Sequence, residues 1–581
     1  TLVSGRELPM HLGLPTRSVH GLPIIEHAEF GRNVPDEAMP DEDKMNLGKI
    51  YHMGKEEAAG LILNRQAMAS HTFITGSTGT GKSNAVYHLL DEITKNGQTT
   101  FLVVEPAKGE YKNVFGNCTD VQVFGTNPRE TPLLRMNPFA FPENIHILEH
   151  IDRLVEIFNA CWPMYAAMPA VLKDAIERSY QKVGWDLRNS ESEKGVFPTF
   201  FDLLDILPGV IEESHYSKDT QSDYVGALCT RVKSLTNGIY GSVLCAEDAL
   251  TDEALFDRNV IVDLSRVGSM ETKSLLMGIL VMKLQEYRMC SSGMNSRLRH
   301  VTVLEEAHNL LRKTSAEQSQ EGANLQGKSV EMLANAIAEM RTYGEGFIIA
   351  DQAPGLLDMS VIRNTNTKII LRLPDEEDRK LVGKSAALKE AQIDELSKLP
   401  LGVAAVYQNE WPEAVLCKIE AYPMPENAVY HKPSKMPHEI NAEFVFGQLA
   451  VGKELEPLSI SEMEQLKLWL KRHETVLKPE DGRYLERVFA GGELDVAKTR
   501  KAVFDFFGGI GTVVDYCAAA KKSLTPRKEF LEQLQGQYGL KAAAADWVLN
   551  SVISMGMSLN PDAKAVDNLR TNFEQQGGRV L

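Results

Sequence analysis

The stretch with the clearest chemistry is Gly76–Asn84, which reads Gly-Ser-Thr-Gly-Thr-Gly-Lys-Ser-Asn. Its spacing fits the phosphate-binding pattern G-x-x-x-x-G-K-[ST]. Glycines let backbone N–H groups close around phosphate oxygens, and the start of the following helix adds partial positive charge. The Lys82 ammonium can reach the β- and γ-phosphates, and the Ser83 hydroxyl can ligate Mg²⁺. The candidate nucleotide-binding residues are Gly76, Thr78, Gly79, Thr80, Gly81, Lys82, Ser83 and Asn84.

A second group of reactive side chains, Glu305-Glu306-Ala307-His308, follows the apolar run Val301–Leu304. A nucleotide hydrolase needs one carboxylate in the Mg²⁺ sphere and another that polarises the attacking water. We expect Glu305 to reach the metal, through water, and Glu306 to orient the nucleophile. Aspartate is the usual first acid, and Glu305 is one methylene longer. The alternative is a pair of solvated acids at a helix start, where the helix dipole favours negative charge.

The elements that must position these residues alternate between strands and helices. Apolar runs typical of strands buried on both faces occur at 72–75, 99–104, 259–264, 301–304, 347–350 and 368–372. Helical apolar spacing occurs between them, notably over Lys273–Tyr287 and Val330–Tyr343. This alternation predicts an α/β fold with a doubly wound, mostly parallel sheet.

The chain divides into three predicted parts. Residues 1–60 read as an irregular arm, and residues 61–425 as an ATPase core with a helical insertion at about 143–258. A hairpin of residues 402–407 and 414–419 closes the core before a proline-rich linker. Residues 440–581 form a C-terminal helical domain, in which Ser461 and Glu464 make a capping box. Its segment Gly508–Gly511 lacks a preceding strand and is interpreted as a turn between helices.

The segment Glu105–Lys112 follows the predicted strand 99–104 and is rich in polar side chains. Polar residues at the carboxyl end of a buried parallel strand face the ligand crevice. A solvated turn is the alternative, and the sequence alone does not separate the two.

Composition bounds the possible functions. The chain has 581 residues with a formal net charge of −17, which argues against a protein that coats nucleic acid with its whole surface but leaves room for a small basic channel. Seven cysteines, none in a C-x-x-C pair, indicate isolated thiols in a reducing, cytoplasmic compartment. No run approaches the length of a membrane span. The chain starts at Thr1, so either an initiator Met was removed or upstream sequence is missing.

Taken together in order, several segments resemble the HerA family of DNA translocases. They are the loop Gly76–Asn84, the acids and histidine of 305–308, Arg341, and Asp351-Gln352-Ala353-Pro354 after the next strand. Asn137-Pro138-Phe139 and the helical insertion are similar to those of the related FtsK and type IV secretion ATPases. The resemblance covers roughly residues 49–425. It omits an N-terminal barrel typical of the family, of which residues 1–60 hold at most a remnant, and it omits the tail 440–581.

The resemblance implies a RecA-like fold, ATP and Mg²⁺ as cofactors, and a homohexamer that moves double-stranded DNA. It implies that Arg341 is an arginine finger for a neighbour's γ-phosphate and that Gln352 is the polar sensor. It also implies a separate nuclease or other effector as partner, in antiphage defence or DNA end processing. Two alternatives remain: a secretion or conjugation ATPase, and a scaffold whose assembly is gated by nucleotide.

A long polar stretch, 312–328, follows the two acids and carries almost no apolar anchor. A structureless loop of this length inside a compact domain is usually functional or disordered. We expect it to border a DNA channel, with Arg312, Lys313 and Lys328 contacting phosphates.

Overall fold

The structure is a computed structural model. It describes residues 27–432 and 495–580, together with residues 18, 20, 484, 485 and 487. Within the two long ranges it omits 36–38, 166, 193–194, 247–248, 315–321, 425–427, 523–524, 539–541, 561 and 579. The capping box expected at Ser461 and Glu464 lies outside the described residues.

The centre of the fold is one large sheet with the strand order β2-β1-β13-β12-β11-β3-β10-β9-β4-β8-β5. From β11 to β5 all neighbours are parallel, and the remaining strands are antiparallel. The strands are β1 (Lys44–His52), β2 (Lys55–Asn64), β3 (Thr72–Thr75), β4 (Thr100–Glu105), β5 (Val121–Gly125), β8 (Asn259–Asp263), β9 (His300–Glu305), β10 (Glu345–Asp351), β11 (Thr367–Ile370), β12 (Val403–Gln408) and β13 (Val415–Ile419). The predicted fold class is confirmed.

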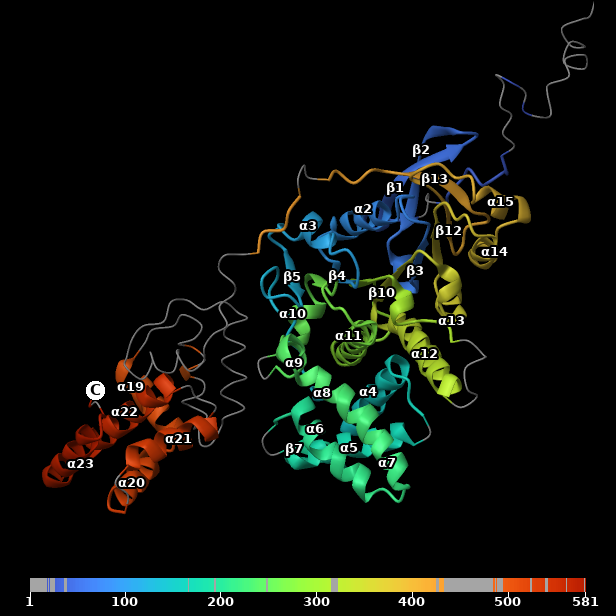
Figure 1. Cartoon of the computed structure of the whole chain (residues 1–581). Helices are drawn as coiled ribbons and strands as arrows, with labels where there is room; N and C mark the ends of the chain where they lie inside the picture. The colour runs from blue at the N-terminus through green and yellow to red at the C-terminus, as the bar shows by residue number, and fades with distance from the viewer. Residues whose placement is uncertain are drawn as a thin grey trace, which may run out of the picture.

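Helices cover both faces of the sheet (Figure 1). One face carries α2 (Lys82–Thr94) and α3 (Tyr111–Phe115), and the other carries α4 (Ile147–Cys161), α11 (Met270–Ser291) and α12 (Gly322–Glu339). Alternate side chains of a strand enter the two cores, as in β4, where Leu102 packs on one side and Val103 on the other. Burial on both faces explains why these strands are continuous apolar runs.

The segment between β5 and β8 is mostly helical and lies below the sheet in Figure 1. Besides α4 it contains α5 (Met168–Lys182), α6 (Phe200–Glu213), α7 (Lys218–Tyr224), α8 (Thr230–Thr236), α9 (Gly238–Leu244) and α10 (Asp252–Phe256), with a small hairpin of β6 (Trp185–Asp186) and β7 (Glu191–Ser192). Its apolar side chains join the core on the α11 face of the sheet.

The hairpin predicted near residue 408 is present as β12 and β13, which pair antiparallel. On its outer side β13 pairs with β1, and β1 pairs with β2. The expected boundary at residue 60 is therefore wrong, because strands assigned to an N-terminal arm belong to the central sheet. Gly48 allows the close approach: a Cβ there would stand 2.2 Å from the Lys418 carbonyl oxygen.

Shorter helices complete the core: α13 (Met359–Arg363), α14 (Glu376–Ser385) and α15 (Glu390–Glu395). The C-terminal part is helical, with α19 (Val496–Phe506), α20 (Gly509–Ala520), α21 (Pro526–Tyr538), α22 (Ala542–Leu559) and α23 (Ala563–Gln575) around its own apolar core. Gly508, at φ 89°, joins α19 to α20, so the predicted helix–helix turn is confirmed at Gly508, whereas residues 509–511 already belong to α20. Of the helices described, none combines the length and apolarity needed to cross a bilayer.

Candidate active site

The glycine-rich segment forms the turn between β3 and α2. Gly79 and Gly81 adopt φ of 77° and 107°, a conformation that side chains disfavour. Gly76 packs against β11, since a Cβ there would stand 2.7 Å from the Leu371 Cβ. The Ser77 N–H donates to the Arg372 carbonyl at 3.0 Å, which ties the loop to the end of the next strand. The loop is thus held in shape by the sheet and not only by its own sequence.

Lys82, the first residue of α2, reaches across the carboxyl edge of the sheet to both acids. Its Nζ donates to Glu305 Oε2 at 3.0 Å and to Glu306 Oε1 at 3.2 Å. Burial by itself lowers the pKa of Lys82, but the two carboxylates outweigh it and the net pKa is raised. The ammonium is therefore charged, buried and paired with the two acids that the sequence singled out.

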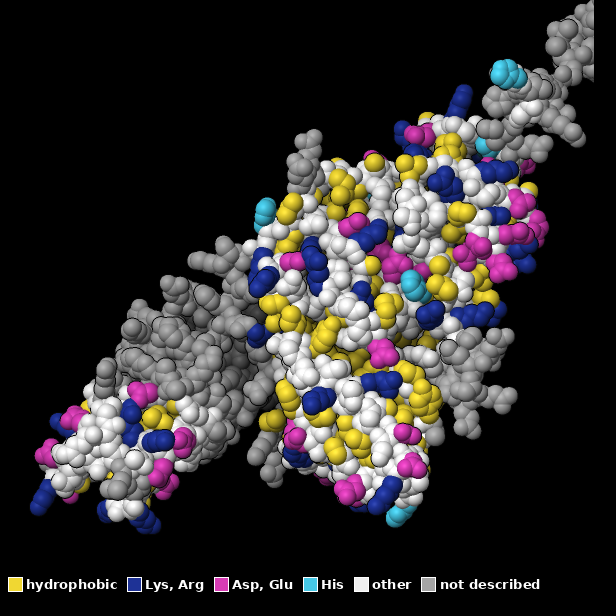
Figure 2. Space-filling model, in the orientation of Figure 1, with side chains coloured by type: hydrophobic (Ala, Val, Ile, Leu, Met, Phe, Trp, Pro, Cys, Tyr) yellow, Lys and Arg dark blue, Asp and Glu magenta, His cyan; other side chains and the backbone are white. Residues whose placement is uncertain are grey.

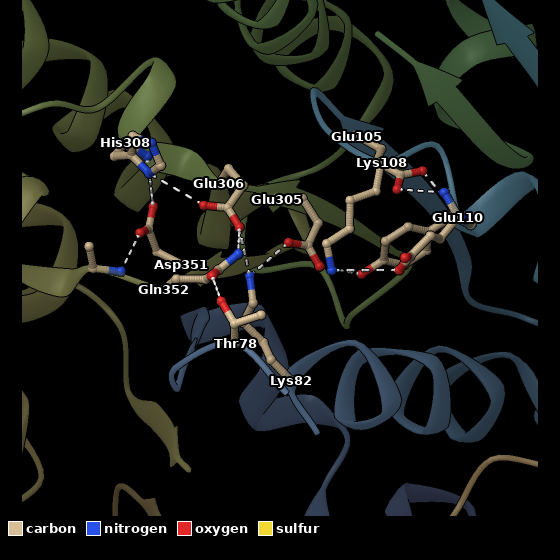
Figure 3. A network of polar contacts seen from close by, with 12 residues as sticks. Thr78, Lys82, Glu105, Lys108, Glu110, Glu305, Glu306, His308, Asp351 and Gln352 are labelled. Carbon is tan, nitrogen blue, oxygen red and sulfur yellow. Dashed lines mark hydrogen bonds and ion pairs between the residues drawn. The ribbon is translucent and has the colours of Figure 1, made fainter. Parts of the chain in front are cut away.

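Glu306 sits in a strained backbone conformation, with φ of 46° directly after β9. This turns its side chain toward the phosphate loop, where it accepts a hydrogen bond from Gln352 Nε2 as well as from Lys82 (Figure 3). Gln352 in turn accepts a hydrogen bond from the Thr78 hydroxyl at 2.6 Å. One amide side chain therefore bridges the phosphate loop and the second acid.

The reason for this convergence is the strand order. In the sheet, β10 lies between β3 and β9, and all three run parallel. Their carboxyl ends present, side by side, the phosphate loop, Gln352 and the acid pair. Beyond β9 comes β4, whose last residue is Glu105.

His308 lies on the far side of Glu306. Its backbone N–H and its Nδ1 contact Asp351 Oδ2 at 2.8 and 2.9 Å, and Nδ1 is 3.6 Å from Glu306 Oε2. The hydrogen bond to Asp351 raises the pKa of His308 despite partial burial. These three side chains are close enough together to form a cation site, but Asp351 is already satisfied by His308 and by the Ala353 N–H.

Glu105 and the residues after it line a cavity of about 280 Å³ together with Ser83, Glu305 and Gln352. Glu105 accepts hydrogen bonds from the backbone N–H groups of Glu110 and Tyr111, at 2.7 and 3.1 Å. Burial raises the pKa of Glu105 to about 8. The crevice interpretation of this segment therefore holds for the lining residues, and the solvated turn does not.

The side chain of Asn84, a predicted nucleotide-binding residue, contacts the chain that follows β13. Its amide oxygen accepts from the Tyr422 N–H at 2.9 Å, and its Nδ2 donates to the Glu420 carbonyl at 3.0 Å. These bonds fix the chain that leaves β13 against the start of α2. The side chain of Asn84 is therefore occupied away from the phosphate loop, and its predicted contact with the nucleotide stays a prediction for its backbone N–H, which these bonds do not use.

Arg341 is not brought to these residues. It lies in the short turn Met340–Tyr343 ahead of β10, whereas Gln352 follows the other end of the same strand. Seven strand residues span roughly 20 Å. Arg341 is exposed and lines a separate groove at the amino edge of the sheet, next to Arg297 and Ser70.

The three basic residues predicted to contact DNA lie in different kinds of structure: two in a loop and one in a helix. Arg312 and Lys313 are exposed in an irregular segment after His308, and the Lys313 N–H donates to the Leu356 carbonyl. Lys328 is also exposed, but it belongs to α12, which begins at Gly322. The expectation of one loop through residue 328 is therefore wrong over 322–328; residues 315–321 lie outside the description.

The side chains present fit a Mg²⁺–ATP complex. A Cβ built on Gly79 meets no atom within 4 Å, so the outer side of the loop is open to phosphates. Lys82 supplies a charged donor, and Ser83 and Glu305 line one cavity as oxygen ligands of the kind that Mg²⁺ prefers. Glu306 lines the same cavity, and its predicted role of orienting the attacking water stays a prediction.

Comparison with known proteins agrees with this geometry. Residues 45–283 match the family model described as "Helicase HerA, central domain". Over these residues the chain is similar to a HerA-type P-loop ATPase core. It is an ATP hydrolase, with the parallel sheet and the phosphate loop of a P-loop ATPase.

Two curated relatives extend the HerA likeness beyond the matched domain. A probable helicase of Methanocaldococcus jannaschii is 23% identical over 436 residues, covering 68% of this chain and 76% of the relative. The DNA double-strand break repair helicase HerA of Sulfolobus acidocaldarius is 25% identical over 393 residues, covering 65% and 69%.

Solved structures also align with the chain. VirB4 of Thermoanaerobacter pseudethanolicus aligns with a TM-score of 0.49 and 18% identity, covering 66% of this chain and 98% of VirB4. The plasmid coupling protein TrwB in complex with ADP and Mg²⁺ aligns with a TM-score of 0.45 and 15% identity, covering 69% and 98%.

Several side chains of the site have contacts that the sequence does not predict. Thr78 is predicted to bind phosphate, and it also donates a hydrogen bond to Gln352. Asp351, which precedes Gln352, contacts His308. Tyr111 lies in the polar segment 105–112, and its phenol donates to Glu305. Position at a strand end was the available signal, but it does not say which way a side chain points.

Substitutions at Lys82 and Glu306 should separate binding from turnover. Lys82→Ala removes the buried cation and should weaken ATP binding. Glu306→Gln keeps the hydrogen-bonding shape but loses the carboxylate that orients water, so binding should persist while turnover falls by about 100-fold to 10,000-fold. Equilibrium binding of a fluorescent ATP analogue and steady-state phosphate release measure the two effects.

Glu110→Gln is the matched control, because Glu110 lines the same cavity as an exposed acid. It should leave turnover near the parental value. Parental turnover by Glu306→Gln, with an inactive Glu305→Gln, would mean that the two acids have exchanged roles.

Proposed function

We propose that this chain is an ATP-driven motor that moves double-stranded DNA through the centre of a homohexameric ring. The observation that carries the proposal is the separation of Arg341 from the site that it is expected to complete. Lys82 and the acids lie at the carboxyl edge of the sheet, and Arg341 lies at the amino edge. If this arginine completes an ATP site, as the family resemblance implies, that site belongs to a second subunit, which a head-to-tail ring would provide.

The proposed hydrolysis uses groups already aligned along the edge of the sheet. Lys82 leaves the two carboxylates and binds the β- and γ-phosphates. Glu306, freed from Lys82, orients the attacking water and takes its proton. Ser83 and Glu305, which line the same cavity, would hold Mg²⁺, and the ion would neutralise part of the phosphate charge. Arg341 from the neighbouring subunit stabilises the charge that develops on the γ-phosphate oxygens.

Gln352 would transmit a change at the nucleotide to other parts of the chain. It contacts both Glu306 and Thr78, so loss of the γ-phosphate changes the groups at both of its ends. Arg341 lies at the other end of the strand that Gln352 follows. A shift of β10 would therefore move Arg341 and the groove that it lines, which in the proposed ring faces the neighbouring subunit.

The DNA substrate is supported by the named relatives, one of which is a DNA double-strand break repair helicase. On the face shown in Figure 2, lysines and arginines are interspersed with acidic side chains. This distribution suits a duplex enclosed by a ring better than one held on that face. We further propose that the motor works with a separate nuclease or other effector, in antiphage defence or DNA end processing, as the family resemblance implies.

Mixing two inactive variants tests the shared site. Arg341→Ala should abolish hydrolysis while nucleotide binding and folding persist, because the guanidinium donors are needed only in the transition state. Mixed with Lys82→Ala, it should recover part of the activity, since some interfaces pair an intact Lys82 with an intact Arg341. Phosphate release from a titrated mixture, after subunit exchange is verified, measures the recovery.

Arg363→Ala is the control, because it removes an exposed arginine from another part of the ATPase domain, the end of α13. This variant should remain active. Full activity of Arg341→Ala alone would refute the shared site. A mixture as inactive as either variant would also count against it, unless hydrolysis requires every subunit of the ring to be intact.

Charge reversal tests the DNA path. Changing Arg312, Lys313 and Lys328 to Glu should lower duplex affinity and reduce the slope of log K against log salt by about 3, one phosphate contact per residue. Duplex stimulation of ATP hydrolysis should fall with it. Fluorescence anisotropy with a labelled duplex at several salt concentrations measures the slope.

Changing the exposed Lys384, Lys389 and Lys398 to Glu alters the net charge equally and should leave the slope unchanged. An unaltered slope in the first variant would remove these residues from the DNA path. If duplex DNA did not stimulate hydrolysis by the parent protein at all, an assembly scaffold gated by nucleotide would be the better account.

A further inference from the structure

Tyr111 contacts one of the two acids of the site, Glu305. Its phenol donates to Glu305 Oε1 at 2.6 Å, and its side chain is buried. Lys82 holds the other oxygen of the same carboxylate, Oε2, at 3.0 Å. The two oxygens of Glu305 are therefore divided between a neutral donor and a cation.

The phenol is itself fixed by its surroundings. The backbone N–H of Tyr111 donates to the buried Glu105 carboxylate, which anchors the start of α3 to the end of β4. The ring meets that of Tyr87, on α2, edge-on with centroids 4.9 Å apart. Tyr111 is thus tied to the sheet by its backbone and to the helix of the phosphate loop by its ring.

Nucleotide binding affects the two partners of Glu305 differently. Lys82 must leave Oε2 in order to bind phosphates. Tyr111 faces no such demand, and a hydrogen bond from a neutral donor to a carboxylate is short and strong. After Lys82 leaves, the phenol still holds Oε1 and leaves Oε2 turned toward the cavity that Ser83 also lines.

We propose that Tyr111 is a positioning residue that holds the Glu305 carboxylate in place for Mg²⁺ when Lys82 moves to the nucleotide. The inference rests on the proposed role of Glu305 as the metal-side acid. It also accounts for the glutamate at a position where aspartate is usual. The longer side chain reaches Tyr111 with one oxygen while the other faces Lys82, and Glu305→Asp, one methylene shorter, would give up one of these contacts.

The test measures how Mg²⁺ changes the affinity for a fluorescent ADP analogue, with the full-length protein. In EDTA, Tyr111→Phe should bind the analogue within about twofold of the parent, because the phenol contacts no phosphate-binding group. In a Mg²⁺ titration, Tyr111→Phe should need about tenfold more metal to reach half of the full tightening, the effect expected for one hydrogen bond to a charged group. Adding Tyr111→Phe to Glu305→Gln should cause little further change, since both act on one carboxylate.

Tyr180→Phe is the matched control, because it removes a buried phenol that donates to the Phe139 carbonyl in the helical insertion. It should leave the Mg²⁺ titration unchanged while costing similar stability in urea unfolding. A parental Mg²⁺ titration for Tyr111→Phe, or an equal weakening in EDTA and in Mg²⁺, would overturn the inference while the shared site of the ring stands. An unchanged titration for Glu305→Gln would instead overturn the metal role of Glu305, and with it the role of Tyr111.

Discussion

The arrangement of the site depends on two ion pairs that share one cation, those of the buried Lys82 ammonium with the buried Glu305 carboxylate and the partly buried Glu306 carboxylate. A buried lysine without partners would be strongly destabilising, and so would two adjacent acids without a cation between them. Each charge therefore requires the others as long as no phosphate is present. In the proposed mechanism, nucleotide phosphates replace the acids as partners of Lys82, and this exchange would let the three residues respond to ATP.

In the proposed mechanism, β10 would carry the effect of this exchange to Arg341. This strand separates β3 from β9 in the sheet and carries Gln352 at its carboxyl end. Arg341 lies just before its amino end. A single buried strand therefore connects the residue that contacts Glu306 with the short turn Met340–Tyr343, which carries the residue proposed to act in the next subunit.

Much of this framework was predictable from the sequence, because local patterns encode it. The phosphate loop needs glycines at fixed spacing, and the continuous apolar runs of β4, β8 and β9 reflect burial on both faces. The hairpin β12–β13 follows from two apolar runs around a short turn. Such signals lie within about ten residues of each other, and none depends on how distant segments pack.

Two features could not be predicted because they depend on contacts between distant segments, and a third because its local pattern is weak. Asn84 sits beside Ser83 in sequence, yet its amide is taken by Tyr422, 338 residues away. The strands β1 and β2 join the sheet only through β13, so their membership was invisible from residues 44–64 alone. Lys328 was assigned to a loop because α12 begins with the polar run Gly-Ala-Asn-Leu-Gln-Gly, in which apolar periodicity is weak.

The most direct test of the account is electron microscopy of the full-length protein with a non-hydrolysed ATP analogue, Mg²⁺ and duplex DNA. We predict a ring in which the Lys82 ammonium has left Glu305 and Glu306 for the phosphates, with Arg341 of the adjacent subunit facing the γ-phosphate. The account would be contradicted if Lys82 were still paired with both carboxylates beside bound nucleotide, or if Arg341 faced solvent in every subunit of an assembled ring.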